Sequence, residues 1–185
     1  MKILMLDDEE YTMADHREAL ESQGHIVYAT TTLKQATTVL QAGFVDLEKQ
    51  IDFVVIDLML EEPLVTGSIA GLNKNKDSLN DYYKNLKAQK LNQGQALGQW
   101  LWERGGRIQH ENGPMHCYFS NVPDLYQFHN AKNQQEFWRG ADSEEVDKNK
   151  VREFVLDKTV IAPNEFPTAI QKIVVLWNKR GWVTK

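Results

Sequence analysis

The run from residue 51 to residue 60 (IDFVVIDLML) constrains the fold of this chain more than any other segment. It is the most apolar stretch in the first half of the sequence, and only Asp52 and Asp57 interrupt it. A sheet with one face in water needs polar residues at alternate positions, whereas a parallel sheet is covered by helices on both faces. The run therefore predicts a strand that is buried on both faces and carries the carboxylate of Asp57 near its end.

Strand-like and helix-like segments alternate along the rest of the chain. The predicted strands cover residues 2–6, 25–30, 51–60, 115–119 and 152–156, and the predicted helices cover about residues 10–23, 32–43, 94–104, 123–138 and 163–177. Gly24 and the pair Gly105 and Gly106 are expected to end the first and third helices, and Thr31 or Thr32 to cap the second. This alternation is typical of an α/β fold with a parallel sheet. Five strands and five helices fit a doubly wound, flavodoxin-like sheet with the strand order 2-1-3-4-5.

The length of 185 residues fits one domain that contains large insertions. We expect a single domain over residues 1–185, with an insertion at about 61–92 and an extended, charged connection at about 128–150. The insertion is rich in Asn, Lys and Gln, and a polar helix is expected around residues 78–89. Its two ends flank the rim of the sheet beside Asp57, so it is either a lid or docking element or a tolerated surface insertion.

Composition excludes several classes of partner. The chain has 26 acidic against 21 basic residues and a formal net charge of −5, so no basic footprint for nucleic acid is expected. No apolar run approaches the roughly 20 residues of a membrane span. Cys117 is the single cysteine, which favours a reducing, cytoplasmic location, and it is expected in the core rather than as a nucleophile. Trp102 and Trp182 are expected at the surface, where they would indicate a protein partner.

Charged and polar residues follow several of the predicted strands. Asp7 and Asp8 end the first strand, Asp57 lies near the end of the third, and Ser120 and Lys158 follow the fourth and fifth. In a doubly wound sheet the ligand site lies outside the carboxyl ends of the strands, so these side chains are expected to converge. Three carboxylates in one crevice repel one another, and a hard divalent cation such as Mg²⁺ relieves that repulsion.

This set of side chains suits phosphoryl transfer. A carboxylate that a rigid strand positions beside Mg²⁺ can act as a nucleophile toward phosphorus, which is the role expected of Asp57. Lys158 would neutralise charge on the phosphoryl oxygens, and Ser120 would donate a hydrogen bond to one of them. No organic cofactor is expected.

The chain resembles the response-regulator receiver domain of two-component signalling. The resemblance rests on residues 3–9 (ILMLDDE), 54–60 (VVIDLML), 118–120 (YFS) and 155–158 (VLDK). Residues 94–97 (GQAL) also resemble the start of the family's third helix. The resemblance implies a CheY-like fold and a stand-alone domain that is phosphorylated by a histidine kinase or phosphotransfer protein, binds an unknown output protein and is not a turnover enzyme.

The resemblance also assigns roles to six residues. These are the phosphoacceptor Asp57, the direct Mg²⁺ ligand Asp8, the water-mediated ligand Asp7, a further ligand in the backbone carbonyl of Met59, the hydroxyl switch residue Ser120 and the phosphate-sensing Lys158.

Other interpretations of the same residues stay open. Asn121, Val155 and Thr159 depart from the family pattern and favour a receiver-like adaptor that no longer switches by phosphorylation. A small Mg²⁺-dependent phosphohydrolase is the third class, and the absence of an acid at Met59, two residues after the nucleophile, argues against it. Asp7 and Asp8 can also be read as a helix cap, and Lys158 as a solvated strand end.

Overall fold

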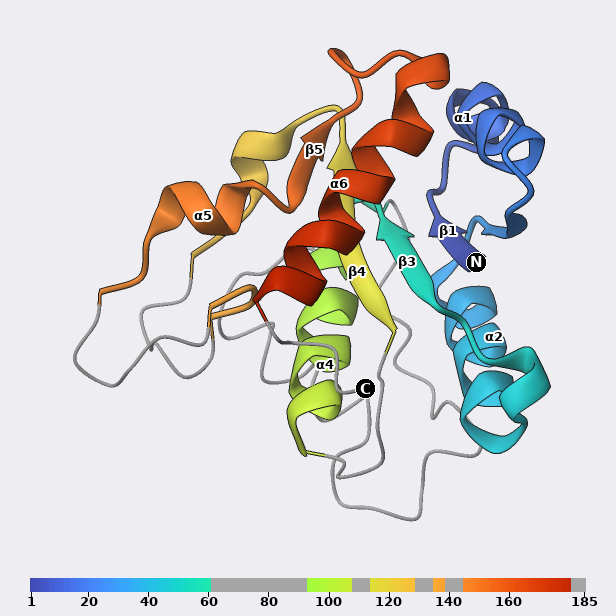
Figure 1. Cartoon of the computed structure of the whole chain (residues 1–185), viewed down its shortest axis with the longest axis horizontal. Helices are drawn as coiled ribbons and strands as arrows, with labels where there is room; N and C mark the ends of the chain where they lie inside the picture. Colours follow the sequence, from blue (N-terminus) through green and yellow to red (C-terminus); the bar gives the residue numbers. More distant parts are fainter. Residues whose placement is uncertain (61–92, 108–113, 129–134, 139–144, 181–185) are drawn as a thin grey trace.

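The computed structural model describes residues 1–60, 93–107, 114–128, 135–138 and 145–180 (Figure 1). Five strands within these residues form one sheet, in which every paired strand is parallel and the order is β2-β1-β3-β4-β5. The strands are β1 (Lys2–Leu6), β2 (Ile26–Thr30), β3 (Phe53–Ile56), β4 (Met115–Ser120) and β5 (Val155–Asp157). The predicted α/β class, the doubly wound sheet and its strand order are confirmed.

Helices cover both faces of this sheet (Figure 1). They are α1 (Glu10–Ser22), α2 (Leu33–Val45), α4 (Gln93–Arg107), α5 (Lys148–Arg152) and α6 (Phe166–Lys179), with short 3₁₀ turns at η1 (Leu47–Lys49), η2 (Pro123–Leu125) and η4 (Pro163–Glu165). On the face of α1 and α6, Phe119 stacks on Phe166 with ring centroids 4.4 Å apart and meets His16 edge-on at 5.0 Å. On the opposite face, Gly98 of α4 lies against the hydroxyl of Tyr118. Because adjacent strand residues point to opposite faces, β4 joins the two helix layers into one core.

Two local signals act as the sequence predicts. The Thr32 hydroxyl accepts a hydrogen bond from the Gln35 amide at 3.1 Å and caps α2. Gly24 follows α1 with φ +79°, a conformation that glycine adopts without steric cost. The predicted stop at Gly105 and Gly106 is wrong, because α4 continues to Arg107. A glycine in a helix costs only about 1 kcal/mol, which the buried face of this helix offsets.

The connection between β4 and β5 differs most from the prediction. The predicted helix over residues 123–138 is absent from the described part of that range, where the chain forms the turn η2 and then a buried turn at residues 135–138. Gln135, Glu136 and Phe137 are fully buried, and they bond to neighbouring elements instead of forming helical hydrogen bonds. The predicted connection ending near residue 150 contains α5, which Asp147 caps by accepting the amides of Asn149 and Lys150.

Two further predictions concern single residues. Trp102 is buried, not exposed, because its ring packs against Phe137 and Trp177 at 5.8 and 5.6 Å. Cys117 is fully buried in β4, as predicted. The insertion at 61–92, its predicted helix at 78–89 and Trp182 lie outside the described residues. Among the helices that the structure describes, none has the length and apolarity needed to cross a membrane.

Candidate functional site

The carboxyl ends of four strands place the predicted site residues at one rim of the sheet. Backbone hydrogen bonds continue one residue beyond β1, β3 and β5: the Asp7 amide donates to the Thr30 carbonyl at 3.1 Å, and the Asp57 amide donates to the Leu6 carbonyl at 2.8 Å. The Lys158 amide likewise donates to the Ser120 carbonyl at 3.0 Å. The backbone of each of these rim residues is therefore fixed by the sheet.

Three carboxylates meet at this rim. Asp7, Asp8 and Asp57 each offer an oxygen, and these oxygens lie within 4.8 Å of one another. Asp7 is 3% exposed and Asp57 is 7% exposed, while Asp8 is half-buried. Charges of like sign at such distances repel strongly where water is excluded, so the cluster requires compensating positive charge.

Lys158 supplies part of that charge. Its ammonium donates to Asp7 Oδ2 at 2.5 Å and to Asp57 Oδ2 at 3.0 Å. The Lys158 side chain is only 4% exposed, so the interpretation of this lysine as a solvated strand end is wrong. Lys158 and Asp57 are 101 positions apart in sequence, and only the parallel pairing of the strands brings them together.

Asp7 is more than a helix cap. Its Oδ1 accepts the Glu9 amide at 3.0 Å just before α1, but the residue at the N-cap position is Glu9, which makes no capping bond with its side chain. The other carboxylate oxygen of Asp7 is the one that faces Lys158. Burial raises the pKa of Asp7, and the neighbouring charge of Asp57 adds to the rise, while Lys158 and the Glu9 amide oppose it.

The rim fits a hard divalent cation. Mg²⁺ binds oxygen at about 2.0–2.1 Å, so two ligands on opposite sides of the ion lie about 4 Å apart. Two of the three carboxylate oxygens, which all lie within 4.8 Å of one another, can take such positions with a small shift, and the third can reach the ion through a water molecule. Three carboxylates against one ammonium also leave net negative charge at the rim, which a divalent cation offsets.

Ser120 and Met59 flank this cluster. Ser120 is buried, and its hydroxyl accepts the Val122 amide at 3.3 Å, which leaves the hydroxyl proton available for donation. The Met59 amide donates to Asp57 Oδ1 at 3.4 Å, while the Met59 side chain is half-exposed. Both residues lie at the predicted rim, and their roles there remain predictions.

Gly94 is a site residue that the sequence reasoning missed. A Cβ at this position would lie 1.7 Å from the Asp57 carbonyl oxygen and 3.0 Å from the Leu58 Cα, so no larger residue fits. The Gly94 amide donates to the Leu58 carbonyl at 3.3 Å and joins the first turn of α4 to the end of β3. The sequence contains 11 glycines, and the resemblance of residues 94–97 to the start of a helix gave this one no role at the site.

Comparison with known proteins adds little to this geometry. No protein-family model and no curated protein matches the chain. One similar solved structure is the N-terminal domain of a response regulator/sensory box/GGDEF three-domain protein from Carboxydothermus hydrogenoformans, with 12% identity, a TM-score of 0.45 and coverage of 98% of this chain and 99% of that one. Another is a fusion that carries the trimeric coiled coil of yeast Spc42, with 13% identity, a TM-score of 0.45 and coverage of 98% and 83%. The fold assignment therefore rests on the strand order and register of the sheet itself.

Proposed function

We propose that this chain is a receiver-like signalling domain that accepts a phosphoryl group on Asp57. The observation that carries the proposal is the buried ammonium of Lys158, which bonds both Asp7 and Asp57 at the carboxyl rim of a 2-1-3-4-5 parallel sheet. A lysine placed there offers positive charge to two nearly buried carboxylates and is positioned to follow charge that is added to Asp57.

The transfer needs one bond to form and one to break. An oxygen of the Asp57 carboxylate attacks the phosphorus of an acyl phosphate or phosphohistidine donor, and a new O–P bond forms. The P–O or P–N bond to the donor breaks, and the leaving group keeps its electron pair. The added negative charge draws the Lys158 ammonium from Asp7 toward the phosphoryl oxygens, and the Ser120 hydroxyl donates to one of them.

Asp8 and Asp57 would hold a Mg²⁺ ion directly, with Asp7 bonded through water and the Met59 carbonyl as a further ligand. The ion would supply neutralisation of the phosphoryl oxygens at the moment of transfer. The proposal rests on the chemistry of the oxygen donors and their spacing within 4.8 Å.

The proposed role is stoichiometric signalling and not turnover. The phosphodonor would be a histidine kinase or phosphotransfer protein in the cytoplasm, and the phosphorylated domain would bind an output protein. We propose that residues 1–185 act as one domain in this role, because β1 and β5, from opposite ends of the chain, both contribute to the rim.

A phosphorylation-independent adaptor is the second candidate, and one observation favours it. Val155, at the position where the family carries a switching aromatic residue, has no ring to move. The neighbouring Phe154 is fully buried and stacks on Phe137 with centroids 4.5 Å apart and an interplanar angle of 12°. A ring packed in this way on the core side cannot serve as a surface switch.

The test is intact-mass spectrometry after incubation with acetyl phosphate and Mg²⁺. We expect one added phosphate on the wild type and none on the isosteric Asp57→Asn. Ser120→Ala is expected to be labelled more slowly, which separates loss of a donor from loss of the nucleophile. A wild type that never gains phosphate, under conditions where a known receiver does, supports the adaptor instead.

A further inference from the structure

A buried turn at residues 135–138, which we name the core plug, fills the edge of the sheet beside β4. β5 pairs with Tyr118 to Ser120, and within the described part of the chain no strand pairs with the first half of β4 on that side. Phe137 occupies the gap, with its ring 4.8 Å from His116 and 6.0 Å from Trp177. The plug therefore joins α4, β4 and α6 where the sheet stops.

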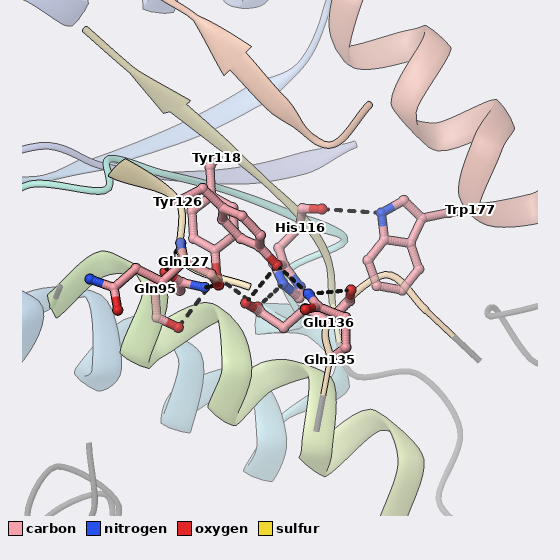
Figure 2. A network of polar contacts seen from close by, with 8 residues as sticks. All are labelled: Gln95, His116, Tyr118, Tyr126, Gln127, Gln135, Glu136 and Trp177. Atoms are coloured by element: carbon pink, nitrogen blue, oxygen red, sulfur yellow. Dashed lines mark hydrogen bonds and ion pairs between the residues drawn. The ribbon is translucent and has the colours of Figure 1, made fainter. Parts of the chain in front are cut away.

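A buried carboxylate holds the plug in place (Figure 2). Glu136 Oε1 accepts the Tyr118 hydroxyl at 2.6 Å and His116 Nε2 at 3.2 Å, and Glu136 Oε2 accepts the Tyr126 hydroxyl at 3.4 Å. A carboxylate only accepts, so His116 Nε2 carries the proton, and His116 Nδ1 has no partner among the described residues. Full burial of Glu136 is tolerated only while these donors stay in place.

The backbone of the core plug is strained at Phe137. Phe137 has φ +56°, a left-handed conformation that is costly for a residue with a Cβ. Arg180 opposes release by donating to the Phe137 carbonyl at 3.3 Å and to Glu153 Oε2 at 2.6 Å. In water, both the strain and the burial of Glu136 disappear. Backbone strain and the burial of Glu136 favour the released state, whereas the hydrogen bonds and packing of the plug favour the seated state. These opposing contributions to the free energy are what a two-state switch requires.

The hydrogen bonds of Glu136 are connected to the Asp57 rim through Tyr118 and the first turn of α4. The Tyr118 hydroxyl lies 3.3 Å from the Gln95 carbonyl, and a Cβ on Gly98 would lie 2.0 Å from that hydroxyl. The Gln95 amide group also holds the backbone of Gln127, at 2.5 and 2.9 Å. Gln95 follows Gly94, which rests on the Asp57 carbonyl.

We propose that the core plug is the output switch of this domain and that the Tyr118–Glu136 hydrogen bond couples it to the Asp57 rim. A change at Asp57 displaces the first turn of α4, because the backbone of Gly94 is in close contact with the Asp57 carbonyl. That displacement moves Gly98, which lies against the Tyr118 hydroxyl, so the hydroxyl shifts away from Glu136. Glu136 then loses its shortest hydrogen bond, and the balance moves toward the released plug. The inference rests on the proposed function for its natural input, but the coupling itself does not need a phosphoryl group.

The experiment is hydrogen–deuterium exchange on the full chain, read in peptides that cover residues 135–138. A double-mutant cycle combines the isosteric rim change Asp57→Asn with Tyr118→Phe, and peptides from β1 report global unfolding. Thr37→Val is the matched control, since it removes another fully buried hydroxyl, on α2. If Tyr118→Phe does not fold, Gly98→Ala displaces the same hydroxyl and replaces it in the cycle.

We expect Asp57→Asn to accelerate plug exchange by about 5- to 150-fold, the usual range of coupling between sites. We expect no further acceleration from Asp57→Asn once Tyr118 is Phe, but the full effect in Thr37→Val. An unchanged plug in Asp57→Asn, or additive effects with Tyr118→Phe, overturns the proposal. If acetyl phosphate never labels the wild type but the double-mutant cycle is non-additive, only the proposed phosphorylation is refuted. If the wild type is labelled but the effects in the cycle are additive, only the proposed coupling is refuted.

Discussion

Replacing Lys158 with methionine tests how the rim is held together. Methionine keeps the length and apolar stem of the side chain and removes only the ammonium, which lies 2.5 Å from Asp7 Oδ2 and 3.0 Å from Asp57 Oδ2. Both carboxylates then remain buried without their cation. Removal of one partner from a buried ion pair costs about 3–5 kcal/mol, and the upper half of this range is expected because two carboxylates lose the same partner.

The loss should be visible in the melting temperature. For a domain of this size, 1 kcal/mol shifts the melting temperature by about 2–4 °C, so Lys158→Met is expected to melt about 8–20 °C below the wild type at pH 8. Urea denaturation followed by circular dichroism gives the free energy directly. Lys172→Met on the exposed face of α6 is the control, expected to stay within about 0.5 kcal/mol of the wild type.

The deficit should shrink as the pH falls. The pKa of Asp7 is raised in the folded protein chiefly by burial, so stability from this group is full below its unfolded value of 3.8 and is lost as the pH rises through the folded pKa. Lys158 opposes that rise, so its removal moves the folded pKa higher and widens the window in which stability is lost. Lys158→Met is therefore closer to the wild type at pH 5 than at pH 8. Equal stability of the two proteins at pH 8 would refute a buried lysine between the two carboxylates.

Three other predictions concern single residues. Asp8→Ala should weaken Mg²⁺ binding in calorimetry much more than Asp7→Ala, because one loses a direct ligand and the other a bridging water; equal, negligible effects would mean that the pair binds no metal. Gly94→Ala should lower the melting temperature more than Gly24→Ala, because a Cβ at 94 would lie 1.7 Å from the Asp57 carbonyl oxygen, whereas at 24 it meets nothing within 4 Å and only the positive φ resists it. Cys117 should not react with a thiol reagent in the native protein, because burial raises the pKa of its thiol far above the usual range; rapid labelling without denaturant would show that β4 opens readily.

The sequence predicted the parts of the fold that local patterns determine. The near-continuous apolar run around Asp57 is typical of a strand buried on both faces, and Thr32 and Gly24 act through their immediate neighbours. The rim followed from the strand order, since parallel strands bring their carboxyl ends together. The burial of Lys158 between two carboxylates was less accessible, because it depends on partners up to 151 positions away.

The segment between β4 and β5 could not be predicted from local patterns. Gln135 and Glu136 have helix-compatible side chains, yet both are fully buried. Their position is set by His116, Tyr118 and Tyr126, which supply the hydrogen bonds that a buried carboxylate needs. Trp102 was misplaced for the same reason, because the ring of Phe137 that covers it comes from this segment.

The most direct test of the proposed function is a crystal structure of the wild type with Mg²⁺ and beryllofluoride, a mimic of the phosphoryl group. The account predicts a beryllofluoride on an Asp57 oxygen and an ion bound by Asp8 and Asp57. It also predicts that the Lys158 ammonium has moved from Asp7 Oδ2, 2.5 Å away without the mimic, to a fluorine. A structure at saturating beryllofluoride and Mg²⁺ with Asp57 unmodified and Lys158 still between the two carboxylates would contradict the account.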